Sequence, residues 1–220
     1  MRLLDLFCAA GGGAMGYHKA GFTEIVGVDF GPQPHYPFNF VQSEALAYLA
    51  NHGHEFDAVH ASPPCQWISK AVKRKNRVNV VNQIPATREA LIASRLPYII
   101  ENVPAACNHL ISPVTLCGSA FGLPVRRHRL FESNVWLWGV QCSHKEYPRR
   151  YPPAWNRTNP LRVLSLSGGY QTKGATLQEH ADALGITWEM TLRELSRVIP
   201  PAYTEWLGRQ LIQHLENPDG

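Results

Sequence analysis

Residues 3–16 read Leu-Leu-Asp-Leu-Phe-Cys-Ala-Ala-Gly-Gly-Gly-Ala-Met-Gly, and this stretch decides which fold class the chain can adopt. The apolar run at 3–7 predicts a short buried strand, the glycines predict a tight turn, and residues 15–20 predict the start of a helix. Glycines let backbone N–H groups approach a ligand, and a helix N-terminus adds partial positive charge there. The stretch therefore predicts a strand, a ligand-binding turn and a helix.

A second strand is predicted at 25–28, and Asp29 at its end is placed to bind two ribose hydroxyls. The glycine turn and Asp29 together predict a nucleoside-cofactor site. Gly11, Gly13 and Gly16 also match the dinucleotide fingerprint, with the acidic residue near the expected spacing of about 20 residues. A NAD-dependent oxidoreductase is therefore one alternative.

The chain continues as alternating strands and helices. Further strands are predicted at 38–42, 57–61 and 98–103, and helices at 44–51 and 87–96. This alternation predicts an α/β fold with a mostly parallel sheet. Glu44, at the start of a predicted helix, either reaches the adenine edge of a cofactor or complements the helix dipole.

Cys65 lies in the loop Ala61 to Ser69, which follows the predicted strand at 57–61. Two prolines stiffen the approach to this cysteine, which places its thiol beyond the carboxyl end of the strand. Open α/β sheets bind their ligands at that edge. The position predicts a nucleophile, although a buried inert cysteine has the same local pattern.

Glu101 lies inside the apolar strand predicted at 98–103. Burial raises the pKa of a carboxyl group, and a carboxylic acid that keeps its proton near neutral pH can donate it to a ring nitrogen. The alternative is a structural acid with a charged partner.

Two groups of basic residues accompany the candidate nucleophile, although the net charge is only +4. Such groups are typical of surfaces that bind polyanions, so nucleic acid is the predicted partner. The first group contains Lys70, Lys73, Arg74, Lys75 and Arg77, and the second contains Arg126, Arg127, Arg129, Lys145, Arg149, Arg150, Arg157 and Arg162.

Composition excludes several classes of protein. The chain has 220 residues and is 45% hydrophobic, which predicts one domain with a small appendage and excludes a disordered or fibrous protein. No apolar run approaches the roughly 18 residues of a membrane span, and residues 1–7 lack a signal-peptide pattern. Five cysteines without framework spacing fit a reducing compartment. The predicted location is the cytoplasm.

A metal site is not predicted. The pairs Cys142-x-His144 and Cys107-x-His109 offer metal-binding side chains, but neither has Cys-x-x-Cys spacing or a strong partner motif.

Taken together, these motifs resemble those of the DNA (cytosine-5)-methyltransferases, and they occur in the order typical of that family. The resemblance covers about residues 1–133 and 191–211. The matching segments are Asp5 to Gly12, Pro64-Cys65-Gln66, Glu101-Asn102-Val103, Arg127-His128-Arg129 and Ile199-Pro200-Pro201.

The resemblance implies a Rossmann-like S-adenosylmethionine-dependent methyltransferase fold that acts on cytosine C5 in double-stranded DNA. Cys65 would attack cytosine C6, Glu101 would protonate N3, and Arg129 would bind the O2 edge. Arg127 and Asn102 belong to the same motifs and are included among the catalytic candidates. The target base would be flipped out of the helix, and the basic segment 68–83 could close over it.

The resemblance also implies a set of cofactor contacts. Phe7 would stack on the adenine, the backbone of Gly11 and Gly12 would lie near the amino-acid portion, and Asp29 would bind the ribose. The predicted cofactor residues are Phe7, Ala9, Gly11, Gly12, Asp29, Glu44 and Pro64.

Some positions depart from the family pattern. Ala9 replaces the usual first glycine, Val125 a common Gln, and Ser196-Arg197 the usual Gly-Asn. A catalytically weak or silent DNA-binding relative is therefore a second alternative.

Three regions are predicted: a catalytic and cofactor-binding core at 1–133, a short target-recognition region at 134–185, and C-terminal helices at 186–220 that complete the core. The recognition region mixes aromatic residues with Arg149, Arg150 and other basic residues. Its shortness predicts either a short target site or help from a partner protein or oligomer, with a monomer expected. A role in restriction-modification of a bacterium or phage-infected cell is the expected setting.

Overall fold

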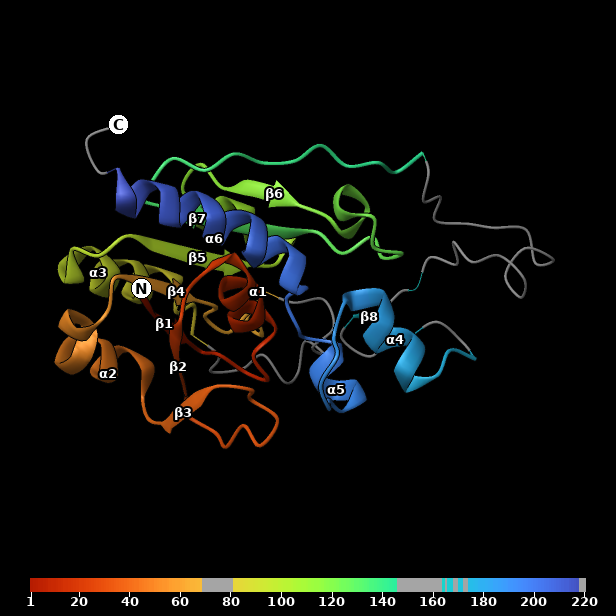
Figure 1. The fold of residues 1–220 in the computed structure, drawn as a ribbon, viewed down its shortest axis with the longest axis horizontal. Coiled ribbons are helices and arrows are strands. Elements are labelled where there is room, and N and C mark those ends of the chain that lie inside the picture. Colours follow the sequence, from red (N-terminus) through yellow and green to blue (C-terminus); the bar gives the residue numbers. More distant parts are fainter. Residues whose placement is uncertain (69–80, 146–163, 165, 168–169, 172–173, 218–220) are drawn as a thin grey trace.

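The computed structural model of this protein describes residues 1–68, 81–145, 164, 166–167, 170–171 and 174–217. In this described part, seven strands form one sheet in the order β3-β2-β1-β4-β5-β7-β6 (Figure 1). Their bounds are β1 (Arg2–Leu6), β2 (Glu24–Asp29), β3 (Asn39–Gln42), β4 (Ala58–Ala61), β5 (Tyr98–Asn102), β6 (Val114–Leu116) and β7 (Arg129–Ser133). β1 to β5 pair in parallel, whereas β7 is antiparallel to both β5 and β6.

Helices cover both faces of the sheet. Alternate residues of β1 point to opposite faces: Leu3 packs with Tyr17 and Tyr203, whereas Leu4 and Leu6 belong to a second cluster. The first face is covered by α1 (Gly12–Ala20) and α6 (Pro201–Glu216), which lie side by side in Figure 1. The second face is covered by α2 (Ala45–His52) and α3 (Ile84–Ser94). The predicted Rossmann-like α/β fold is confirmed.

Two glycines of the opening stretch let α1 pack closely against α6 and against the segment just before it. A Cβ on Gly16 would collide with Thr204 Oγ1 and the Pro201 carbonyl, and a Cβ on Gly12 with Val198 and the Ile199 carbonyl. The Thr204 hydroxyl donates a 2.8 Å hydrogen bond to the Gly13 carbonyl across the same contact. Close approach of the two helices therefore requires small residues here.

Most predicted elements have nearly their predicted bounds, but α3 begins earlier than predicted. Pro85 lies in the first turn of α3, where backbone N–H groups have no intrahelical acceptor, so the N–H that proline lacks is not needed. The Asn82 side chain accepts a hydrogen bond from the Ile84 N–H at 3.0 Å. The helix predicted at 87–96 therefore starts about one turn earlier, at Ile84.

The remaining elements are short. They are the hairpin β8 (Leu166–Ser167) and β9 (Tyr170–Gln171), the helices α4 (Leu177–Leu184) and α5 (Leu192–Leu195), and the 3₁₀ turns η1 (Gly53–Glu55), η3 (Pro104–His109) and η4 (Gly118–Phe121). Capping boxes begin α4 at Thr176 and α5 at Thr191. α4, α5 and the chain between them form a third apolar cluster with Ala10 and Val125. None of the described helices is both long and apolar enough for a membrane crossing.

Candidate active site

The predicted site residues come from strands that end at one edge of the sheet. β1, β2, β4 and β5 run in parallel, so their carboxyl ends lie together. β7 is antiparallel to β5, and its register pairs Leu130 with Asn102. The first residue of β7, Arg129, therefore lies at the edge where β5 ends.

Arg129 and Glu101 form an ion pair inside this edge. The Nε of Arg129 lies 2.8 Å from Oε1 of Glu101, and both side chains are largely buried. Burial raises the pKa of Glu101 above its ordinary value, while the charges of Arg129 and Arg127 and a hydrogen bond from Ser62 oppose the rise. A carboxyl group in this position holds its proton more firmly than an exposed one does.

Cys65 is half-buried in the loop that leaves β4, close enough to Glu101 and Arg129 for their charges to act on its thiol. Burial raises the pKa of Cys65, the negative charge of Glu101 raises it further, and the charges of Arg129 and Arg197 lower it. The structure therefore brings together the three residues that the sequence predicts for covalent catalysis.

Asn102 holds the loop of Cys65 against β5. Its Nδ2 donates to the Pro63 carbonyl at 2.9 Å, and its Oδ1 accepts from the Val103 N–H at 3.0 Å. Both side-chain groups are thus used within the protein, and Asn102 positions the loop.

Arg127 is buried behind Arg129 and joins the C-terminal segment to the site. Its Nη2 donates to the Ser196 carbonyl at 2.9 Å, and its own carbonyl accepts from the Tyr203 hydroxyl. Burial, reinforced by the charge of Arg129, lowers the pKa of Arg127 to about 9. Ser196, one of the positions that depart from the family pattern, therefore contributes its backbone to the site.

A buried hydrogen-bonded chain that the sequence did not predict leads to the same edge. The Tyr17 hydroxyl lies 2.9 Å from His60 Nδ1, and His60 Nε2 lies 3.0 Å from the Ser62 hydroxyl. Burial lowers the pKa of His60 to about 3, so this imidazole is neutral at physiological pH. A histidine inside an otherwise apolar strand was the available signal.

The turn after β1 binds Asp29 at the end of β2. The Asp29 carboxylate accepts from the Ala9 N–H and the Gly31 N–H, both at 3.2 Å. Phe7 and Ala9 have left-handed backbones, with φ of 56° and 46°. Glycine tolerates this conformation best, which explains why a glycine is usual at the position of Ala9.

The N-terminus of α1 has no side-chain cap among the described residues, because Gly11 is its N-cap, in the left-handed conformation at φ 80°. The N–H groups of this first turn are therefore suited to an anionic group.

Two other predicted cofactor residues have different surroundings. Glu44 caps α2, because its carboxylate accepts from the N–H groups of Leu46 at 3.2 Å and Ala47 at 2.6 Å. Of its two alternatives, the contact with the helix terminus is the one that the structure contains, and the contact with adenine stays a prediction. Pro64 is half-buried beside Cys65.

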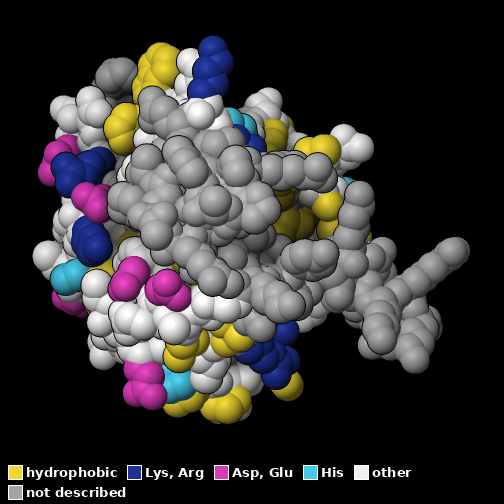
Figure 2. Space-filling view, turned by 90° about the vertical axis from the view of Figure 1, so that its right-hand side faces the viewer, with side chains coloured by type: hydrophobic (Ala, Val, Ile, Leu, Met, Phe, Trp, Pro, Cys, Tyr) yellow, Lys and Arg dark blue, Asp and Glu magenta, His cyan; other side chains and the backbone are white. Residues whose placement is uncertain are grey.

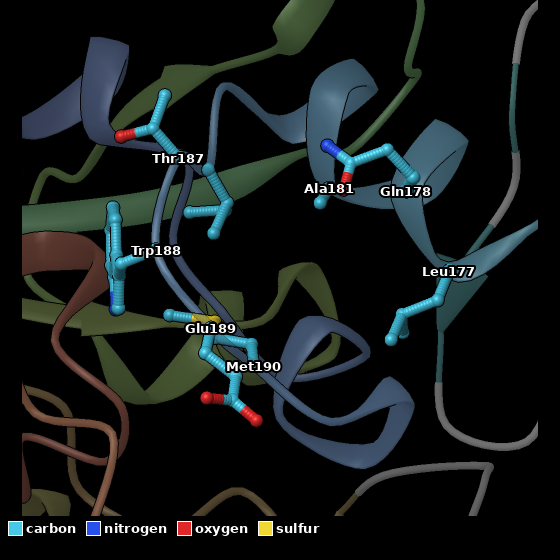
Figure 3. A pocket seen from close by; sticks show the side chains of 8 residues that line it. Leu177, Gln178, Ala181, Thr187, Trp188, Glu189 and Met190 are labelled. Atoms are coloured by element: carbon cyan, nitrogen blue, oxygen red, sulfur yellow. The ribbon is translucent and has the colours of Figure 1, made fainter.

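A pocket of about 320 Å³ lies near the turn after β1, between α4 and the segment 186–190 (Figure 3). Trp188, on one side of it, donates its indole N–H to the Ala10 carbonyl at 3.2 Å. Leu177 and Gln178 line the pocket from α4. The pocket contains none of the predicted site residues, so it is not the predicted cofactor site.

The predicted DNA-binding residues Lys70, Lys73, Arg74, Lys75, Arg77, Arg149 and Arg150 lie outside the described residues. Figure 2 looks onto the side where the parallel strands end. The described Lys and Arg side chains lie there in separate groups around the rim, with Asp and Glu side chains between some of them. The described residues alone form no continuous basic surface in this view.

Comparison with known proteins agrees with this arrangement. The sequence pattern of the family described as C-5 cytosine-specific DNA methylase matches residues 1–132. No curated protein matches the chain.

Two solved structures share the fold. One is an Escherichia coli protein assigned as a DNA modification methyltransferase encoded within a prophage, with a TM-score of 0.63, 15% identity, and coverage of 99% of this chain and 100% of the other. The second is the Entamoeba histolytica methyltransferase EhMeth, with a TM-score of 0.56, 12% identity and 98% coverage of both chains.

The family match extends over more than half of the chain and includes the turn after β1, Cys65, Glu101 and Arg129. This chain belongs to the C-5 cytosine-specific DNA methylase family.

Proposed function

We propose that this DNA cytosine methyltransferase uses an S-adenosylmethionine-type donor and a covalent bond between Cys65 and C6 of a flipped-out cytosine. The observation that carries the proposal is the ion pair between Glu101 and Arg129, at 2.8 Å, whose charges both act on the thiol of Cys65. A nucleophile, a proton donor and a fixed cation are the groups that activation of cytosine C5 requires.

In the first step, the Cys65 sulfur bonds to C6, and the electrons of the C5–C6 double bond move toward C5 and the ring. Glu101 gives a proton to N3 and so neutralises the charge that develops there. Arg129, which is held beside Glu101, offers its guanidinium to the O2 edge. The electron-rich C5 then accepts the methyl group, and a base removes the C5 proton. The Cys65–C6 bond breaks with its electron pair returning to sulfur, and N3 returns its proton to Glu101, which restores the aromatic ring.

The raised pKa values of Cys65 and Glu101 are compatible with this chemistry. The reactive pair is a thiolate and a carboxylic acid, and it carries the same number of protons as a thiol and a carboxylate. One proton therefore has to move from the thiol to the carboxylate, and no net charge has to enter the buried site.

The turn after β1 fits a nucleoside donor. Asp29 is held by two backbone N–H groups with its carboxylate at the strand end, and the first turn of α1 offers N–H groups to a carboxylate. A sulfonium donor bound there would supply the methyl group. Phe7 would contact the base, Asp29 the ribose, and Gly11 the amino-acid portion.

Duplex DNA is the proposed partner, and the cytosine has to leave the stacked helix because its C6 atom is inaccessible there. The recognition of a particular sequence is assigned to the region 134–185. Size measurement in solution distinguishes the expected monomer from an oligomer or a complex with a helper protein.

The test is a covalent trap. Duplex DNA that contains 5-fluorocytosine at target sites should become covalently bound to the protein when a methyl donor is present, because fluorine cannot leave as the C5 proton does. Cys65→Ser should abolish both the adduct and the transfer of tritiated methyl groups, while DNA binding persists. Cys107→Ser, which changes an exposed cysteine, is the matched control and should behave as wild type.

Normal methyl transfer by the Cys65→Ser protein would contradict the covalent mechanism. DNA binding by the wild type without any methyl transfer would favour the silent relative.

A further inference from the structure

Four metal-binding side chains lie together outside the catalytic set: Cys117, His128, Cys142 and His144. Each contributes one ligand atom, and these four atoms all lie within 4.8 Å of one another. Cys117 is buried and the other three are partly buried. Two thiols and two imidazoles in one place are the ligand set of a closed structural zinc site.

Sheet pairing brings the first two ligands together. β6 and β7 are antiparallel, and their register pairs Leu116 with Arg129. Cys117 follows Leu116 and His128 precedes Arg129, so the two residues face each other one step beyond the last strand pair. The segment after β7 then brings Cys142 and His144 to the same place, with one residue between them.

Two of the sulfur–nitrogen distances agree with tetrahedral geometry. Cys117 Sγ lies 3.5 Å from His144 Nε2, and Cys142 Sγ lies 3.6 Å from His128 Nε2. With Zn–S of about 2.3 Å and Zn–N of about 2.0–2.1 Å, two tetrahedral ligands of this kind are about 3.5 Å apart. The two imidazole rings stand almost perpendicular, at 89°, with centroids 5.0 Å apart.

The surroundings suit a thiolate-bound cation. The Ser119 hydroxyl donates to Cys117 Sγ at 3.4 Å, and Arg126 donates to the backbone carbonyl of His144 at 2.5 Å. Such outer contacts orient metal ligands and stabilise thiolate charge.

We propose that Cys117, His128, Cys142 and His144 bind one Zn²⁺ ion. The ion joins the β6–β7 hairpin to the segment 134–145, where the predicted target-recognition region begins. His128 is also the middle residue of Arg127-His128-Arg129, so the ion holds the backbone between the two arginines of the active-site edge.

This proposal revises the expectation that the protein binds no metal. That expectation rested on the spacing around Cys142 and His144, whereas their partners come from a hairpin earlier in the chain. The similar pair Cys107-x-His109 is not part of the cluster: the Cys107 thiol contacts Asn108, and His109 contacts Asn82 and Trp67.

The test measures metal in the full-length protein, purified under reducing conditions without added chelator. About one Zn²⁺ per chain is expected by elemental analysis. Replacing it with Co²⁺ should give the strong visible bands of tetrahedral Co²⁺ and a thiolate charge-transfer band. Cys142→Ser and His144→Asn should weaken Zn²⁺ binding by more than about 100-fold, since loss of an outer contact alone costs about 10–100-fold. Cys107→Ser should keep full binding.

Removal of the ion with a strong chelator should lower the melting temperature of the wild type and of Cys107→Ser. It should leave that of Cys142→Ser unchanged, because this variant has no ion to lose. Binding by the wild type is measured directly, so the test does not depend on the variants folding.

The proposal is overturned by reduced wild-type protein that binds neither Zn²⁺ nor Co²⁺, by Co²⁺ spectra of octahedral type without a thiolate band, or by a Cys117–Cys142 disulfide in protein alkylated at cell lysis. Wild-type Zn²⁺ affinity in a folded Cys142→Ser protein would count equally against it.

Discussion

At the scale of single residues, two buried acids on neighbouring strands show how surroundings assign different roles. Glu132 on β7 accepts two hydrogen bonds from Arg88, both at 2.6 Å, and one from the Ile111 N–H at 2.8 Å. Its carboxylate is therefore saturated by partners. Glu101 on β5 has an ion pair with Arg129 and a pKa raised by burial. Of the two, Glu101 is the one suited to exchange a proton with a substrate.

The pH dependence of methyl transfer tests this role of Glu101. In the proposed mechanism, the active form of the enzyme shares one proton between Cys65 and Glu101, so the rate should fall as pH drops through the raised pKa of Glu101, where both groups become protonated. The rate should also fall as pH rises through the raised pKa of Cys65, where both groups are ionised. Single-turnover rates across pH would reveal a plateau with two limbs.

Glu101→Gln should lower the plateau by about 100-fold or more, since positioned proton transfer contributes roughly 10²–10⁴-fold. The fall in rate at low pH that depends on the Glu101 carboxyl group should be absent from this variant. The rate that remains should rise with pH as the Cys65 thiol ionises. An unchanged profile would assign Glu101 a purely structural role.

Glu132→Gln provides the matched control for a buried acid. It leaves Arg88 largely buried without a charged partner, so it should lower the free energy of unfolding by about 3 kcal/mol. Chemical denaturation measures this loss. The folded fraction should keep the wild-type pH profile, and a profile shifted as in Glu101→Gln would contradict the division of roles.

Ala9 gives a second prediction at this scale. Its left-handed backbone at φ 46° disfavours any side chain, so Ala9→Gly should stabilise the protein by about 0.5–1 kcal/mol in thermal unfolding. Ala10→Gly, next in the chain and buried, is the control and should destabilise by a similar amount because Ala10 has no such backbone strain. Destabilisation by Ala9→Gly would show that its methyl group contributes more through packing than it costs in strain.

At the scale of elements, the position of Cys65 depends on how its loop is attached to β5. Asparagine side chains bind the backbone near both ends of β5: Asn102 is its last residue, and Asn134 follows β7. Asn102 binds the Pro63 carbonyl at the active-site edge, while Asn134 binds the Tyr98 N–H at 2.7 Å and the Leu96 carbonyl at 3.0 Å at the opposite edge. The two contacts are chemically alike but differ in what they position.

Asn102→Ala and Asn134→Ala should therefore separate stability from catalysis. Each leaves backbone groups without their partner and should cost about 1–3 kcal/mol in denaturant unfolding. Only Asn102→Ala should lower kcat, by about 10-fold or more, with the KM for the methyl donor unchanged, because a loosened loop misplaces the thiol. Equal kcat losses in both variants would mean that general destabilisation is responsible.

At the scale of the whole molecule, one edge of the sheet combines the chemistry with the predicted DNA contacts. The turn after β1 that is proposed to bind the cofactor, Cys65, Glu101 and Arg129 all lie there, and the proposed zinc site would anchor the start of the region 134–185 beside them. The basic residues at 70–77 directly follow the loop of Cys65 in the sequence. Phosphate contacts near the reacting base and sequence recognition by a separate region are the expected division of labour.

Salt dependence tests that division. DNA affinity should fall with salt with a log–log slope of roughly −0.9 per neutralised phosphate. Replacing Lys73, Arg74 and Lys75 with Ala should flatten the slope and leave the methylated sequence unchanged. Lys19, Arg95 and Arg209, three exposed basic residues of helices or their ends, provide a control triple mutant with the same change in charge and an unchanged slope. An altered site pattern in the first mutant would mean that this segment reads bases.

The sequence by itself determined the α/β class, the positions of the five parallel strands and the family motifs. Buried parallel strands are continuous short apolar runs, and the residues at or just beyond their carboxyl ends lie at a common edge. Asp29, Cys65 and Glu101 could therefore be placed from local pattern alone. The methyltransferase family and the fold were confirmed by the comparisons and the structure.

Only the tertiary structure decided which strands pair and which side chains contact each other. The strands β6 and β7 were not predicted, because antiparallel pairing at the end of a sheet depends on contacts between distant segments. That pairing places Arg129 beside Glu101 and sets Cys117 opposite His128. Likewise, the tight packing around Gly12 and Gly16 depends on a C-terminal segment nearly 200 residues away. Local patterns specify strand and helix, whereas the partners of a buried charge or thiol are set by the register between strands and by packing across the sheet.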